Sequence, residues 1–153
     1  MATHTAQYPA HIDPAQVRKV ELFDRKVVYE SPFGVVADTP DAYRDEPGLE
    51  FISRVPVTWD ETRFLAGEIG EFIVLARRKG RDWYVGAMTN ESGRTVELPL
   101  DFLGTGRFEA TAWTDGVSPR DVKVERLTLA GQRRPVTLRL APSGGAALHF
   151  RAR

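Results

Sequence analysis

The 153-residue sequence contains no cysteine, and this absence excludes several kinds of chemistry at once. Disulfide bonds, thiolate nucleophiles and cysteine-ligated zinc sites all require that residue. Histidine is scarce too: His4, His11 and His149 are the three present, and none pairs with another at helical or strand spacing. We therefore expect no metal or cofactor in this chain, and we expect the His149 side chain to face solvent.

The sequence also lacks a net charge, a long apolar run and a secretion signal. Its 21 basic side chains balance 21 acidic ones, whereas a nucleic-acid partner needs a concentrated basic face. No stretch approaches the roughly 20 apolar residues of a membrane span, and residues 1–13 lack the basic and then apolar pattern of a signal peptide. We expect neither a nucleic-acid nor a membrane partner. The compartment stays open, because a fragment would not carry its parent's targeting signal.

The stretch around which the chain is organised runs from Gly70 to Asn90. The unbroken apolar run 72–76 is typical of a buried strand. In the next segment, which begins at Trp83, every second residue is apolar. The pair Lys79-Gly80 between them predicts a tight turn. These residues therefore predict a β-hairpin in the middle of a sheet.

The chain downstream of residue 57 predicts further strands at regular intervals. About eight short strands, roughly ten residues apart and separated by glycine-rich turns, favour an antiparallel β-sandwich. The alternation of apolar residues breaks between Val124 and Leu127, where we expect a β-bulge. The predicted strands span residues 59–65, 70–78, 82–89, 94–99, 107–114, 121–129, 135–140 and 146–151.

The chain upstream of residue 57 has helical character instead. Asp13-Pro14 is a helix start, and the apolar residues that follow it at helical spacing predict an amphipathic helix from 14 to about 29. Further helical turns are predicted after Thr39-Pro40 and from 49 to 53, whereas 33–37 could be a buried strand or more helix. The fold class is thus mainly β, with a short helical segment before the sandwich. We divide the chain into a flexible arm (1–12), a helical part (13–56) and a β-sandwich domain (57–153).

Few residues stand in a pattern that indicates chemistry. Trp59, Asp60 and Glu61 are adjacent at the start of the first predicted strand, and could form a sugar-binding platform of indole and carboxylates; the alternative is a strand start anchored by its indole. Trp113 lies with polar residues on one side of its predicted strand. Its ring could stack on a sugar ring, or it could pack under a loop or a partner domain. No serine stands in a nucleophile-elbow context. The residues alone predict no catalytic site.

Four segments of the sequence together resemble a known enzyme family. VVYESPFGVVADTPDAY is followed by EFISRVPVTWDETRFLAGEIGEFIVLARRKGRDWYVGAMTN, then by LPLDFLGTGRFEATAWTDG and LAPSGGAAL. In this order and spacing they resemble the C-terminal part of the family 97 glycoside hydrolases, which are enzymes of the α-glucosidase and α-galactosidase type. Such enzymes have an N-terminal β-sandwich, a central (β/α)8 barrel and a small C-terminal β-domain.

The resemblance implies that residues 13–56 are the end of a barrel and that the strands after them form the C-terminal β-domain. The catalytic carboxylates and calcium-binding glutamates of the family lie in segments that this chain does not contain. No catalytic residue is therefore expected here, and calcium is implied for the parent enzyme only. If 33–37 is a barrel strand, Asp38 is the nearest residue to an active-site rim, because barrel sites gather at the carboxyl ends of strands; a helix cap is its other role. The resemblance also implies a periplasmic or secreted parent.

The implied function is a non-catalytic C-terminal β-domain with a structural, interdomain or oligomerisation role. Residues 13–56 cannot close a barrel alone, so their apolar faces should fold back over the sandwich, meet a second copy of the chain, or leave this part poorly ordered. Expected partners are the rest of the glycosidase or a second copy, with carbohydrate as a further candidate. One alternative is a carbohydrate-binding module that uses Trp59, Trp83 or Trp113. Another is part of an α-glucosidase that acts on α-glucosides once joined to its barrel.

Overall fold

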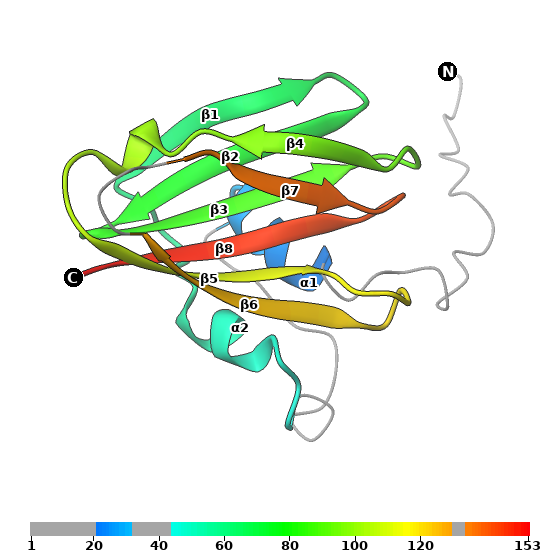
Figure 1. Ribbon diagram of the computed structural model, residues 1–153, viewed down its shortest axis with the longest axis horizontal. Helices are drawn as coiled ribbons and strands as arrows, with labels where there is room; N and C mark the ends of the chain where they lie inside the picture. The colour runs from blue at the N-terminus through cyan, green and yellow to red at the C-terminus, as the bar shows by residue number, and fades with distance from the viewer. Residues whose placement is uncertain (1–20, 32–43, 130–133) are drawn as a thin grey trace, which may run out of the picture.

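The computed structural model describes residues 21–31, 44–129 and 134–153, and within these ranges the chain forms two antiparallel sheets (Figure 1). The larger sheet has the strand order β1-β2-β3-β8-β5-β6, and the smaller one pairs β4 with β7. This architecture confirms the predicted mainly-β sandwich of about eight strands. The strands are β1 (Glu61–Glu68), β2 (Phe72–Lys79), β3 (Asp82–Thr89), β4 (Arg94–Leu98), β5 (Phe108–Asp115), β6 (Val122–Leu129), β7 (Val136–Leu140) and β8 (Gly145–Ala152).

The predicted hairpin lies inside the larger sheet. β2 and β3 pair from Phe72 opposite Thr89 to Lys79 opposite Asp82, so two residues make the turn. Gly80 has a φ of 59°, a backbone conformation that glycine adopts without steric cost. β2 is flanked by β1 and β3 by β8, so both strands of the hairpin are interior.

The main hydrophobic core lies between the two sheets. Val85, Leu148 and Phe150 point from the larger sheet toward Leu98 and Leu138 of the smaller one, and all five are at most 2% exposed. The 3-10 turn η2 (Asp101–Leu103), which follows β4, adds two further buried side chains to this core. Alternation along each strand places these residues on one face, as the sandwich requires.

The predicted bulge in β6 is wrong. β5 and β6 pair without a register shift, with Trp113 opposite Val124 and Ala110 opposite Leu127. The apolar alternation breaks for a different reason: Val124 lies on the outer face of the sheet and is 41% exposed. A register shift occurs instead in the edge strand β1, between Phe64 and Ala66, where a bulge is common.

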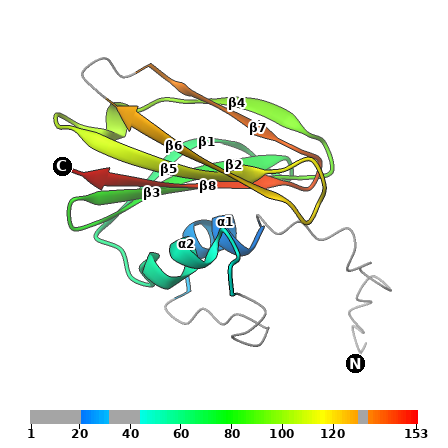
Figure 2. The same cartoon turned by 60° about the horizontal axis from the view of Figure 1, so that its bottom comes forward.

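Two helices form a third layer on the outer face of the larger sheet (Figure 2). The described helix α1 (Glu21–Val28) falls within the helix predicted for 14–29, and its remaining residues 14–20 lie outside the described ranges. α1 lies so close to β3 that Gly86 has no room for a side chain. A Cβ atom placed there would lie 2.9 Å from the Val27 side chain and 2.8 Å from the Asp24 carbonyl oxygen. Within the described ranges, neither helix is long and apolar enough to cross a membrane.

An aromatic cluster joins the helical layer to the sheet. At its centre is Phe51 of α2 (Leu49–Arg54), which is 2% exposed. Its ring centroid lies 5.0 Å from that of Trp113 and 6.3 Å from those of Phe23 and Tyr84. Phe23 belongs to α1, Tyr84 to β3 and Trp113 to β5. One side chain therefore ties both helices to two strands, and each aromatic pair adds to the stabilisation from burial alone.

We predict that Phe51→Ala lowers the free energy of unfolding by about 3–5 kcal/mol, because it removes a buried ring and leaves a cavity between the layers. Chemical denaturation followed by circular dichroism measures the change. Phe64→Ala is the matched control: Phe64 is 64% exposed, so its loss should change stability by no more than about 0.5 kcal/mol. Equal effects of the two substitutions would contradict the central place of Phe51.

Candidate functional site

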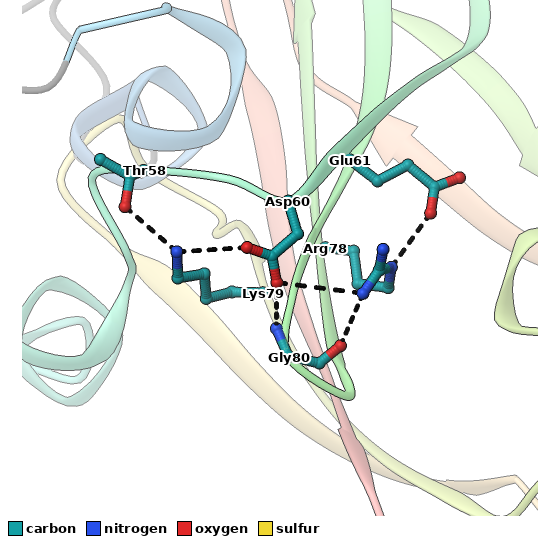
Figure 3. Close-up of polar contacts among 6 residues, drawn as sticks. All are labelled: Thr58, Asp60, Glu61, Arg78, Lys79 and Gly80. Carbon is teal, nitrogen blue, oxygen red and sulfur yellow. Dashed lines mark hydrogen bonds and ion pairs between the residues drawn. The ribbon is translucent and has the colours of Figure 1, made fainter.

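Asp60 stands just before β1 and accepts hydrogen bonds from the β2–β3 turn (Figure 3). Its Oδ2 atom accepts from the backbone N–H of Gly80 at 2.7 Å, and its Oδ1 atom accepts from Lys79 Nζ at 3.3 Å. The same Lys79 ammonium donates to the Thr58 hydroxyl at 3.2 Å. The carboxylate therefore fastens the chain before β1 to the end of the central hairpin.

Glu61 completes this network with two arginines, Arg63 and Arg78, and Figure 3 shows its contact with Arg78. Its carboxylate accepts from Arg63 Nε at 2.6 Å and from Arg78 Nε at 3.0 Å. Hydrogen bonds from Arg63 and Arg78 lower the pKa of Glu61, and the Gly80 N–H, followed by Lys79, lowers the pKa of Asp60. Both groups are ionised carboxylates already engaged by the protein.

A cavity of about 380 Å³ lies beside these residues and is also bordered by Trp59 and Arg77. The structure thus brings Trp59, Asp60 and Glu61 together, but the last two are engaged in the network. The Trp59 ring is half-buried, with its centroid 5.4 Å from that of Tyr84. Of these three predicted site residues, Trp59 exposes part of its ring to the cavity.

Arg77 forms the inner side of this cavity and is only 3% exposed. Its Nη2 atom donates to the Val28 carbonyl oxygen at 3.3 Å, at the C-terminus of α1, where a cation is favourable. Its guanidinium carbon lies 5.8 Å from the centre of the Trp59 ring. Arg77 therefore connects α1 to the large sheet and restricts access to one side of Trp59.

The remaining tryptophans cannot stack on a ligand in this conformation. Trp113 is 2% exposed, packs against Phe51 and donates from Nε1 to the Pro47 carbonyl oxygen at 2.9 Å. Trp83 is 4% exposed and packs in the main core against Phe102. Asp38, the candidate rim residue, lies outside the described ranges.

The expectation that His149 faces solvent is wrong. Its Nε2 atom lies 2.9 Å from Asp82 Oδ2, and its ring stacks on Tyr84 with centroids 4.4 Å apart and planes 7° from parallel. The side chain is 14% exposed. The reason is the position of β8, which lies in the interior of the larger sheet with the helical layer against its outer face, so the side chains on that face are also covered.

A second cavity, of about 410 Å³, lies between α2 and the outer face of the larger sheet. Tyr84, His149, Arg126 and Arg151 are among the residues that line it. Sequence reasoning did not single out Tyr84 or the two arginines, because they meet only through cross-strand pairing. In the part of the chain that the structure describes, no three His, Asp or Glu side chains gather as a metal site would require.

Comparison with protein families identifies the β-domain. Residues 58–151 match the family described as "Glycosyl-hydrolase 97 C-terminal, oligomerisation". The chain belongs to this family. The match covers every strand of both sheets and ends at the penultimate residue of β8.

Relatives agree with this assignment. The chain is 40% identical to a retaining alpha-galactosidase from Bacteroides thetaiotaomicron over 94% of its own length and 22% of that protein's length. A glycoside hydrolase family 97 enzyme from Pseudoalteromonas sp. strain K8, solved in complex with acarbose, is 38% identical with a TM-score of 0.83, and the match covers 90% of this chain and 23% of that one. A beta-arabinopyranosidase is 29% identical with a TM-score of 0.71, over 86% and 21% of the two chains. The chain thus spans less than a quarter of the length of each.

We predict that Lys79→Met raises the pKa of Asp60, because it removes a hydrogen bond and a positive charge, while the Gly80 N–H still holds it below the usual 3.8. NMR titration of the side-chain carboxyl carbon measures this. Lys123→Met removes the same charge from the ion pair between Lys123 and Glu125 on β6, and should leave the pKa of Asp60 unchanged.

The lowered pKa of Asp60 makes the stability of the fold depend on pH. Because the folded pKa of Asp60 lies below its unfolded value, the network stabilises the fold above the unfolded pKa. This contribution is lost as the pH falls through the folded pKa. An Asp60 pKa that is the same in the wild type and in Lys79→Met would contradict the assigned cause.

Proposed function

We propose that this chain is a non-catalytic C-terminal β-domain of a family 97 α-glycosidase, with a structural role in joining the enzyme's parts or copies. The observation that carries this proposal is the state of its carboxylates. A glycosidase needs a general acid with a raised pKa beside a second carboxylate. Asp60 and Glu61 have lowered pKa values instead and are bound by lysine, arginine and backbone groups.

The expected partners are the rest of the glycosidase or a second copy of this chain. The family description names oligomerisation, and the surface retains large apolar side chains that a partner could cover, including Phe64 at 64%, Tyr29 at 56% and Val57 at 52% exposure. α1 and α2 occupy the outer face of the sheet, which supports a role of the helical part in the contact between the β-domain and the barrel.

We propose that the parent enzyme acts on α-galactosides or α-glucosides and is periplasmic or secreted. The name of the Bacteroides relative, retaining alpha-galactosidase, and the acarbose complex of the Pseudoalteromonas enzyme support this substrate class. We assign no metal or cofactor to this chain, and any calcium of the parent belongs to the barrel. Joined to that barrel, the chain would be part of an active glycosidase.

The purified chain should be a dimer or larger in size-exclusion chromatography with light scattering, and should not turn over nitrophenyl α-galactoside or α-glucoside. A strictly monomeric chain would contradict the oligomerisation role. Turnover that survives repurification and is abolished by Asp60→Asn and Glu61→Gln together would contradict the non-catalytic role. Limited proteolysis of the same sample tests whether the N-terminal part stays folded over the sheet.

The alternative function is carbohydrate binding, and one observation favours it: half-buried Trp59 borders the cavity of about 380 Å³. Malto-oligosaccharide titration followed by tryptophan fluorescence tests it. A saturable response that Trp59→Ala removes, and that Trp113→Phe retains, would support binding at this cavity. No response at all is the result that our main proposal predicts.

A further inference from the structure

The cavity under α2 has a polar floor and two arginines at its edge. Its volume is about 410 Å³. Thr111 of β5 is opposite Arg126 of β6 on one side and His149 of β8 on the other. Arg151 lies two residues further along β8, on the same face of the sheet. Figure 2 shows α2 beneath these strands, so the cavity is bounded on both sides by elements of this chain.

The charges around this cavity are unbalanced in favour of the cations. Each acid that borders it or lies beside it has a cationic or imidazole partner: Glu50 pairs with Arg54 at 3.0 Å, Glu109 with Arg153, and Asp82 with His149. Arg126 and Arg151 have no ion pair or hydrogen bond to any other residue of the described structure. Two guanidinium groups are therefore available to a ligand.

Tyr84 adds a neutral hydrogen-bond donor to the cavity lining. The residue is 5% exposed, and its hydroxyl has no hydrogen-bond partner within the described ranges. Burial, followed by the nearby charge of Asp82, raises the pKa of Tyr84, which keeps the phenol protonated at neutral pH. The protonated hydroxyl of Tyr84 can therefore donate a hydrogen bond to a ligand oxygen in the cavity.

The same lining argues against a neutral sugar as the ligand. Sugar rings stack on open aromatic faces, whereas one face of Tyr84 is covered by His149 at 4.4 Å and Trp113 is only 2% exposed. The cavity is lined instead by two guanidinium groups without an ion pair in the described structure and by one hydroxyl donor. Guanidinium groups bind carboxylate and phosphate oxygens through short, charge-assisted hydrogen bonds.

We propose that the cavity between α2 and strands β5, β6 and β8 binds a small oxyanion, held by Arg126 and Arg151 with the Tyr84 hydroxyl as a third donor. Carboxylate and phosphate share this chemistry. Anion binding at this site is a different function from the interdomain and oligomerisation role. The test of anion binding therefore does not depend on the oligomeric state.

The test is a titration of the ¹⁵N-labelled full chain with sodium acetate, glucuronate or inorganic phosphate at constant ionic strength, followed by amide chemical shifts. We expect saturable shifts centred on Thr111, Arg126 and His149. Stronger binding of phosphate than of acetate would identify the preferred anion, and stronger binding of glucuronate than of acetate would show that the cavity also contacts the rest of the ligand. Glucose, the neutral counterpart of glucuronate, should cause no saturable shift.

Variants separate a built site from a general ion effect. Arg126→Met and Arg151→Met should each weaken binding roughly tenfold or more, because each removes a charge-assisted hydrogen bond. Tyr84→Phe should weaken it less and leave the ring packing intact. The matched control is Arg139→Met, which removes an exposed charge from β7 in the smaller sheet and should bind like the wild type.

Two results would overturn the proposal. One is the absence of saturable shifts with all three anions; the other is equal weakening by Arg126→Met and Arg139→Met. The oligomeric state, measured on the same samples by light scattering, tests the proposed function separately. A dimer without anion binding would reject this site alone, and anion binding by a monomer would reject the oligomerisation role alone.

Discussion

The packing of Phe51 between α1, α2 and the large sheet is the interaction on which the rest of the structure depends. Its ring contacts Phe23, Tyr84 and Trp113, which come from one helix and two strands. Close approach of α1 to Gly86 brings the helices near enough for this cluster to form. Without it, the outer face of the larger sheet would expose its aromatic side chains, and the helical part would have no fixed position.

This arrangement gives the candidate site residues contacts that stabilise the fold. Asp60 and Glu61 fix the start of β1 to the central hairpin, and Arg77 binds the end of α1. Trp113 packs beneath α2. Their side chains therefore support the layered architecture of a C-terminal, oligomerisation domain of glycosyl hydrolase 97. The guanidinium groups of Arg126 and Arg151, which form no ion pair or hydrogen bond within the described residues, border the proposed oxyanion site.

The sequence predicted the strands well because their signals are local. Alternation and glycine turns placed all eight strands, and 82–89 was predicted with the bounds that β3 has. The pairing of distant strands has no local signal, so the position of β8 between β3 and β5 could not be derived. That position buries His149 and assembles the cavity around Tyr84, both of which the sequence analysis missed. The false bulge in β6 has a related cause, since an exposed valine on the outer face imitates a break in register.

The central claim is that the helices and the sandwich form one folded unit. Native-state hydrogen exchange tests it most directly, because it gives the opening free energy of each amide. We predict that the backbone amides of Val27 and Val28 in α1 are protected to nearly the same free energy as those of Val85 and Leu148 in the sheet. Exchange of the α1 amides at the rate of an unstructured peptide, beside a protected sheet, would contradict it.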